Sequence, residues 1–271
     1  MRNGELEMLN KAECQETAKM FLEELDSLSN HRSLASSARS STLPDGYAVQ
    51  DAFHDLLIGR GHSISGWKVA LTSAAMQEFC GVTHPLAGAV FDNDVHQAPA
   101  RVDLSQHLHM GVECEIAVFV NRDLTLDIGP HTRESISKAV ETCSPAFEMI
   151  EDRNADYSNL NTFDLVSENA WNAGVVIGVG PAEWKAIDLK NGSTKLEVNG
   201  ELVGEGKTGD ALGHPLDAVA WLANHLNERD IYVKAGQFVM TGSSVVTYFP
   251  KASDHLVFSV DGCELLTVEC V

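Results

Sequence analysis

Two acidic residues stand in the middle of an otherwise apolar segment, Gly111–Val120. Side chains alternate between the two faces of a strand, so Glu113 and Glu115 share one face with Ala117. The opposite face carries only apolar residues and Cys114, which indicates core. Neighbouring carboxylates repel each other, and a cation between them removes that repulsion. The pattern therefore predicts a cation site, with an exposed edge strand as the alternative.

A third carboxylate, Glu148, lies between two large apolar residues in a second segment, 144–153. A buried carboxylate is costly unless it is paired or bound to a metal. Ligand sets made of oxygen alone suit Mg²⁺ or Mn²⁺ better than zinc, and no histidine or cysteine set has ligand spacing nearby. The sequence thus predicts that Glu113, Glu115 and Glu148 hold Mg²⁺ or Mn²⁺. In the alternative, Glu148 pairs with Arg153.

A lysine, Lys68, occupies an apolar segment just after Gly66. Burial makes an ammonium costly and lowers its pKa easily, so such a lysine can anchor a substrate carboxylate or transfer protons. The alternative is a side chain at a strand end whose amine reaches solvent. Further along, the small residues 241–244 follow an apolar run, and their backbone amides could bind an anion.

Several short strand-like segments must position these side chains. They cover residues 67–71, 112–120, 146–150, 175–179 and 237–240. Asn199-Gly200 and Asp261-Gly262 predict two hairpins, because both pairs suit two-residue turns between alternating strands. Helices are predicted over 132–142 and 214–227, the second with Pro215 in its first turn. Strands and helices do not alternate regularly, so we expect an α+β fold with a mixed, curled β core and flanking helices.

The N-terminal part has a different pattern. Apolar residues over 6–28 recur at helical spacing, a Ser- and Arg-rich connection follows, and a second helix begins at Pro44. We therefore predict a small, mainly helical unit over residues 1–65 and a mixed β catalytic domain over residues 66–271.

Charge and composition exclude several classes of partner. The chain has 271 residues with 19 Lys and Arg against 39 Asp and Glu, a net charge of −20. Phosphate backbones and anionic membrane surfaces attract clustered basic residues, so neither nucleic acid nor membrane is an expected partner. No signal peptide or long apolar span is visible, and the six cysteines form no regular framework. We expect a cytoplasmic protein.

Six segments in the same order resemble a known family. They are GWKVALTSAAMQEFCGV, GVECEIAVFVNRDL, PAFEMIEDRNADY, ENAWNAGVVIG, ALGHPLDAVAWLANHL and FVMTGS. The sequence is similar to the 2-keto-4-pentenoate hydratase and 4-oxalocrotonate decarboxylase branch of the fumarylacetoacetate hydrolase superfamily, from about Tyr47 onward. The resemblance implies the β roll of that superfamily's C-terminal domain, and a homo-oligomer.

The same resemblance implies roles for the acidic residues and the lysine. Glu113, Glu115 and Glu148 would hold a divalent metal, and Lys68 matches the active-site lysine of the family. A glutamate at the third position is typical of the hydratases and decarboxylases. The hydrolases of the superfamily usually carry aspartate there and use a His and Glu on a lid helix, for which His84 has no matching partner. Hydrolysis is therefore disfavoured.

Two positions depart from the family pattern. Asn93 stands where the family has an acid, with Asp94 next to it, and Trp171 stands where the family commonly has a small serine. We expect Asp94 to share proton transfer with Lys68, and we expect Trp171 to alter the substrate pocket. The residues predicted to bind substrate are Leu71, Thr72, Asn93, Trp171, Thr241, Gly242 and Ser243.

The predicted activity is that of a lyase, a hydratase that adds water to a 2-hydroxy-2,4-dienoate or 2-keto-4-enoate in the breakdown of aromatic compounds. The substrate would be a small anionic acid. One alternative is a decarboxylase of a 4-oxalocrotonate-like diacid, which a basic group at the far end of the pocket would favour and Trp171 disfavours. The other is a non-catalytic assembly partner of the same fold. The three carboxylates, a divalent cation and Lys68 would together carry no net charge, so the acidity of the chain belongs mostly to its surface.

Overall fold

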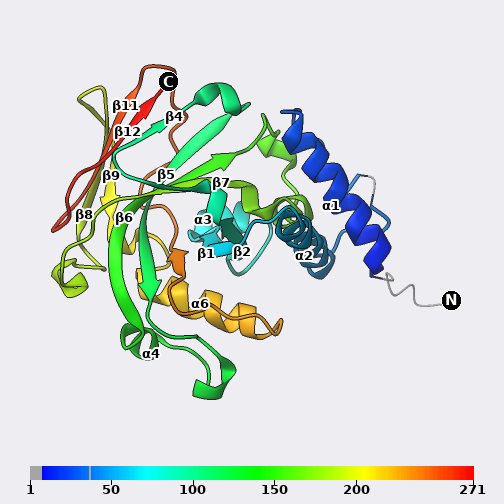
Figure 1. Cartoon of the computed structure of the whole chain (residues 1–271), viewed down its shortest axis with the longest axis horizontal. Helices are drawn as coiled ribbons and strands as arrows, with labels where there is room; N and C mark the ends of the chain where they lie inside the picture. Colours follow the sequence, from blue (N-terminus) through cyan, green and yellow to red (C-terminus); the bar gives the residue numbers. More distant parts are fainter. Residues whose placement is uncertain (1–7, 37) are drawn as a thin grey trace.

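A curled, seven-stranded mixed sheet forms the centre of the computed structural model, which describes residues 8–36 and 38–271 (Figure 1). Its strands run in the order β2-β1-β10-β5-β6-β7-β3. They are β1 (Ile64–Ala70), β2 (Leu86–Phe91), β3 (Val95–Gln97), β5 (Met110–Val120), β6 (Val140–Glu151), β7 (Asn172–Ile177) and β10 (Phe238–Met240). The expected α+β fold with a mixed, curled β core is confirmed.

A second sheet of five strands lies beside the first, in the order β4-β12-β11-β8-β9. Its strands are β4 (Ala100–Val102), β8 (Ser193–Val198), β9 (Glu201–Lys207), β11 (His255–Val260) and β12 (Leu266–Cys270). Both predicted hairpins are present. Asn199 and Gly200 have φ of 55° and 85°, as a tight two-residue turn requires, whereas the loop after Val260 is five residues long.

In the described residues six α-helices flank the sheets, and three of the predicted helix starts carry a recognisable signal. They are α1 (Lys11–Asp26), α2 (Leu43–Gly59), α3 (Ala74–Phe79), α4 (Arg133–Ser137), α5 (Thr162–Ser167) and α6 (Pro215–Asn227). Asn10 and Thr42 each form a capping box, and Pro215 occupies the first turn of α6. None of the described helices is long and apolar enough to cross a bilayer.

The helix predicted over 132–142 is largely wrong. It ends at Ser137, and Val140–Thr142 begin strand β6 instead. Val140 and Thr142 pair with the end of β5, so the ladder extends through residues whose local pattern looked helical.

The N-terminal helices pack on each other around a separate apolar cluster. Phe21, Leu34, Val49 and Phe53 belong to it, and Phe163 of α5 completes it from the second part of the chain. Residues 6 and 7 of the first predicted helix lie outside the described residues. The division into 1–65 and 66–271 stays a prediction.

A buried arginine ties α1 to the central sheet. Arg153, just after β6, is 1% exposed, and its guanidinium lies 3.0 Å from Glu24 of α1 and 2.9 Å from Glu168 beyond α5. Charges are almost never buried unless they are paired, and Arg153 has two partners. The alternative in which Arg153 pairs with Glu148 is therefore wrong.

Candidate metal centre

Strands β5 and β6 place three carboxylates on one face of the central sheet. Glu113 lies directly across from Glu148 in the antiparallel register, and Glu115 is two residues further along β5. Each of the three offers an oxygen within 4.8 Å of the others. β5 runs between β10 and β6, and Glu115 is 1% exposed, so the exposed edge strand considered as an alternative is wrong.

Lys68 of β1 joins this acidic group. Its Nζ lies 3.0 Å from Glu148 Oε1, and the residue is only 2% exposed, so its amine does not reach out to solvent. Asn172, at the start of β7, donates a second hydrogen bond of 2.8 Å to the same oxygen. One oxygen of Glu148 is thus fixed by two donors from two other strands.

The segment after β10 fixes the other two carboxylates. The Gly242 amide donates to Glu115 Oε2 at 2.8 Å, and the Thr247 hydroxyl donates to Glu113 Oε1 at 2.8 Å. Gly242 has φ of +100°, and a Cβ there would overlap the Thr72 side chain. A glycine is required at this turn because it brings the backbone amide against the carboxylate.

Two carboxylate oxygens of the group have no hydrogen-bond partner. They are Glu115 Oε1 and Glu148 Oε2, and both are buried. Buried polar atoms are nearly always satisfied, so two unpartnered carboxylate oxygens in one group fit a set of metal ligands. Three carboxylates with free oxygens fit a hard divalent cation, which prefers oxygen ligands.

The pKa shifts reflect the same crowding. Burial raises the pKa of Glu115 well above its usual value, and the charges of Glu148 and Glu113 raise it further. Burial also raises the pKa of Glu148, although Lys68 opposes that effect. Burial lowers the pKa of Lys68, but the three carboxylates outweigh it and raise that pKa overall. Three carboxylates thus lie beside a single ammonium group.

A cavity of about 400 Å³ opens beside this group. Among the predicted residues, Lys68 and Glu113 line it, as do Leu71, Thr72, Trp171, Gly242 and Ser243. Thr241 does not line it; the residue is 1% exposed and its hydroxyl donates to the Ile116 carbonyl. The Ser243 hydroxyl, in the turn after β10, already forms hydrogen bonds within the protein. It donates to the Val245 carbonyl and accepts from the Cys114 amide.

Asn93 and Asp94 lie outside the cavity that Lys68 lines. They belong to a short turn after β2 and line a separate cavity of about 290 Å³, which shares Trp171 with the first. The Asn93 amide donates to Asp94 Oδ1 at 2.8 Å, and burial raises the pKa of Asp94. The structure does not bring Asp94 into the cavity that Lys68 lines, so its role in proton transfer stays a prediction without geometric support.

Trp171 separates the two cavities from a fixed position. Its indole Nε1 donates to Glu168 Oε2 at 2.8 Å, and its ring meets the Tyr157 ring edge-on at 5.8 Å. Asn169, Ala170 and Trp171 all have positive φ, between 49° and 60°, which is uncommon for residues other than glycine.

Sequence reasoning missed several residues of the site. Asn172, Thr247 and Tyr157 were not predicted, although the first directly follows Trp171 in a segment that was singled out. Asn172 and Thr247 bind carboxylates on β6 and β5, and Tyr157 packs on Trp171 in another loop, so spacing along the chain carries no signal for them.

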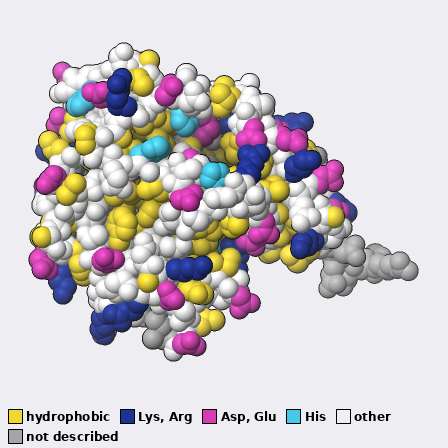
Figure 2. All heavy atoms as spheres, in the orientation of Figure 1, with side chains coloured by type: hydrophobic (Ala, Val, Ile, Leu, Met, Phe, Trp, Pro, Cys, Tyr) yellow, Lys and Arg dark blue, Asp and Glu magenta, His cyan; other side chains and the backbone are white. Residues whose placement is uncertain are grey.

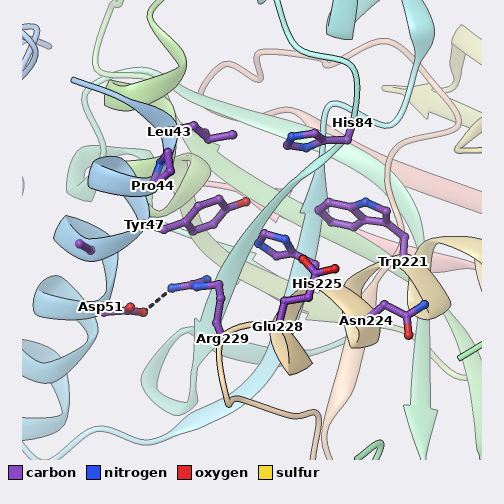
Figure 3. Close-up of a pocket in the computed structure, with 11 residues that line it drawn as sticks. Leu43, Pro44, Tyr47, Asp51, His84, Trp221, Asn224, His225, Glu228 and Arg229 are labelled. Atoms are coloured by element: carbon purple, nitrogen blue, oxygen red, sulfur yellow. Dashed lines mark hydrogen bonds and ion pairs between the residues drawn. The ribbon is translucent and has the colours of Figure 1, made fainter. Parts of the chain in front are cut away.

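A larger cavity, about 670 Å³, contains none of the predicted residues. It lies between α2 and α6, where the rings of His84, Trp221 and His225 stack in a row (Figure 3). Arg229 there is tied to Asp51 at 2.6 Å. Choosing the candidate site by cavity volume alone would therefore miss the carboxylate group.

Comparison with known proteins agrees with this geometry. The fumarylacetoacetate (FAA) hydrolase C-terminal family model matches residues 79–269. The chain belongs to the fumarylacetoacetate hydrolase family. That match spans β5, β6 and the turn after β10, the segments that carry the carboxylates and Gly242.

Relatives within this family include enzymes of two kinds. A 2-keto-4-pentenoate hydratase of Burkholderia vietnamiensis is 32% identical, over 80% of this chain and 81% of the relative. A 4-oxalocrotonate decarboxylase of Pseudomonas putida is 34% identical, over 82% and 83%. The solved structure of 4-oxalocrotonate decarboxylase from Pseudomonas putida G7, complexed with magnesium and adipate, superposes with a TM-score of 0.92 at 27% identity, covering 97% of this chain and 99% of that one.

Proposed function

We propose that this protein is a metal-dependent hydratase, a lyase that adds water to a 2-keto-4-enoate formed from its 2-hydroxy-2,4-dienoate tautomer in the breakdown of aromatic compounds. One observation carries the proposal. Three carboxylates with two unpartnered buried oxygens lie beside a buried lysine at the floor of a cavity. The 32% identical relative named as a 2-keto-4-pentenoate hydratase supports the reaction.

Glu113, Glu115 and Glu148 would hold the divalent cation. When bound, the cation supplies positive charge next to the carboxylate and C2 oxygens of the substrate, which stabilises negative charge that develops there. Magnesium in the solved relative supports Mg²⁺, and Mn²⁺ accepts the same oxygen ligands.

Lys68 would hold and move the proton. Its ammonium has three donors, and the contact to Glu148 uses one of them, which leaves N–H groups for the cavity that the residue lines. The nearby carboxylates raise the pKa of Lys68, and a cation that neutralised them would lower that pKa toward a value useful for acid–base catalysis.

A decarboxylase is the second candidate, favoured by the TM-score of 0.92 and by the relative with 34% identity. It would release CO₂ from a 4-oxalocrotonate-like diacid at the same carboxylates. Release of CO₂ from the diacid, measured beside loss of dienol absorbance from the five-carbon acid, separates the two activities.

Metal removal tests the proposal. We expect turnover of 2-hydroxypenta-2,4-dienoate to be lost after dialysis against EDTA and restored by Mg²⁺ or Mn²⁺. The variant Glu148→Gln should bind Mg²⁺ at least about 10-fold more weakly by calorimetry. Glu141→Gln, an exposed glutamate on the same strand, is the matched control. Full hydration after metal removal would exclude this function, as would absence of any turnover with metal present.

Self-association and a cytoplasmic location stay predictions. Light scattering of the purified chain tests the predicted homo-oligomer. Turnover of any 2-keto or dienol acid would dismiss the alternative of a non-catalytic partner.

A further inference from the structure

Apolar side chains make up much of the cavity lining. Leu71, Met76, Ile150, Leu160, Leu165 and Val245 line it. Met76 of α3 is 38% exposed and Val246 is 89% exposed, which marks the mouth, whereas Lys68 at 2% marks the floor. Figure 2 shows apolar side chains gathered in the middle of one face of the molecule.

A second carboxylate on a ligand would find hydroxyl groups but no unpaired cation among the described residues that line this cavity. Among the described residues that line it, the one cation is Lys68, which already pairs with Glu148. The other charged lining residues are acids, Glu113 and Asp210, and Asp210 is exposed. An unpaired carboxylate enclosed among apolar groups is strongly disfavoured.

Trp171 supplies a large apolar surface to the same cavity. Its ring is held by the hydrogen bond to Glu168, which Arg153 fixes in turn at 2.9 Å. At about 30 Å³ for each water-sized group, the cavity of about 400 Å³ has more room than a five-carbon acid fills. The remaining space suits a hydrocarbon tail beside the indole ring.

We propose that this site selects 2-keto or dienol monocarboxylates that carry an apolar tail, rejects the matching terminal dicarboxylates, and uses Trp171 as a specificity-determining residue. The inference rests on the hydratase function proposed above, and it names the substrate class of that site.

Two saturated acids of equal length test the inference without needing turnover. 2-Oxoheptanoate and 2-oxoheptanedioate present the same 2-keto acid end and differ in the terminal carboxylate. In calorimetry of the full chain with Mg²⁺, we expect the monoacid to bind at least about 10-fold more tightly. Equal affinities, or tighter binding of the diacid, would overturn the inference.

A cation added at the mouth should relax the selectivity. The variant Met76→Lys places an ammonium where the terminal carboxylate of the diacid would lie, so the ratio of the two dissociation constants should fall at least about threefold. Met76→Gln has similar length without charge and serves as the control. If both variants changed the ratio equally, charge would not be the cause.

Trp171 is tested by the ratio of affinities for 2-oxoheptanoate and pyruvate, which has the same reactive end but no tail. Trp171→Ser should lower this ratio about 10-fold, and Trp171→Phe, which keeps an aromatic ring, should lower it less. An unchanged ratio in a folded Trp171→Ser would remove Trp171 from the proposal.

These outcomes differ from failure of the proposed function. Loss of all turnover together with tight, selective monoacid binding would reject the hydratase and keep the substrate class. Turnover of the five-carbon acid with no preference between the two probes would keep the hydratase and reject the substrate class.

Discussion

At the residue scale, the carboxylate group is costly in the absence of a cation. Glu113 and Glu148 face each other across two strands, an arrangement that destabilises a sheet when both residues carry the same charge. Lys68 compensates for one of them, at 3.0 Å from Glu148. The remaining repulsion is energy that cation binding releases, so the folded state and the loaded site are thermodynamically linked.

We expect Lys68→Met to lower kcat without preventing Mg²⁺ binding. The variant keeps all three carboxylates but has no ammonium, so kcat should fall at least about 100-fold while Mg²⁺ still binds. Steady-state kinetics and calorimetry measure the two effects. Lys195→Met, on the exposed side of β8, is the control. A variant with normal kcat would show that the proton travels by another route.

The residues that the sequence predicted best are those whose surroundings along the chain are informative. Glu113, Glu115, Glu148 and Lys68 each interrupt an apolar strand, and that local contradiction identified them. Thr247, which holds Glu113, sits 134 positions away in sequence and looks like any polar loop residue. Only the three-dimensional structure shows that Thr247 contacts Glu113.

At the element scale, the turn after β10 is the part of the backbone that acts on the site directly. Gly242 combines a positive φ with close contact to Thr72 and donates its amide to Glu115. Its positive φ and the contact with Thr72 both disfavour any residue that has a Cβ at this position.

Gly242→Ala should be much more destabilising than an alanine at a free turn. We expect a loss of about 3 kcal/mol in the free energy of unfolding, from backbone strain and overlap with Thr72, and weaker Mg²⁺ binding. Gly81→Ala has a comparable φ of +69° with no neighbour within 4 Å, and should cost about 1 kcal/mol. Chemical denaturation measures both. Equal costs would contradict the role of the contact with Thr72.

The segment after α5 contains a carboxyl group that titrates near neutrality. Burial raises the pKa of Glu168 to about 7, although Arg153 and the Trp171 indole oppose the shift. His31 lies 3.5 Å away, and Asp164 adds negative charge nearby.

Glu168 should make stability depend on pH. Its folded pKa of about 7 exceeds its ordinary value of 4.5, so the folded chain keeps a proton that the unfolded chain releases. Its contribution is full below about pH 4.5 and is lost as the pH rises to about 7, a change of up to about 3 kcal/mol. Glu168→Gln cannot ionise, so urea denaturation between pH 5 and 8 should show a flatter profile. An unchanged profile would indicate that Glu168 stays ionised beside Arg153.

Elements with a strong local pattern were predicted well, and those formed by pairing were not. The alternation in 112–120 predicted β5, whose Val112, Cys114 and Ile116 belong to the main core. Strand β2 was missed because its residues, Leu86–Phe91, are small and buried on both faces and do not alternate. Pairing with β5 also places Val140 in a strand, although the local sequence pattern predicted a helix there.

At the scale of the whole molecule, a net charge of −20 opposes the approach of an anionic substrate. The site offsets this locally through Lys68 and a bound cation. The sequence predicted that the three carboxylates, the cation and Lys68 carry no net charge together. It did not predict the apolar lining of the cavity, because that lining comes from segments far apart in the chain.

Salt should therefore accelerate substrate capture. With Mg²⁺ held constant, we expect kcat/KM for the five-carbon acid to rise about two- to threefold as KCl increases from about 10 to 150 mM, since the Debye length shortens. The value of kcat at saturating substrate is the internal control and should stay constant. A fall in kcat/KM with salt would mean that the local positive charge governs capture.

The left-handed backbone at Trp171, with φ of 60°, is a local cost that the packing of the ring must outweigh. A bulky residue in that conformation costs about 1–2 kcal/mol, which asparagine or glycine would largely avoid. Loss of the ring, which is 6% exposed and donates to Glu168, costs about 3–5 kcal/mol, so either replacement should lower the melting temperature of the chain. The strained backbone and the ring that it presents to the cavity are therefore stable only together.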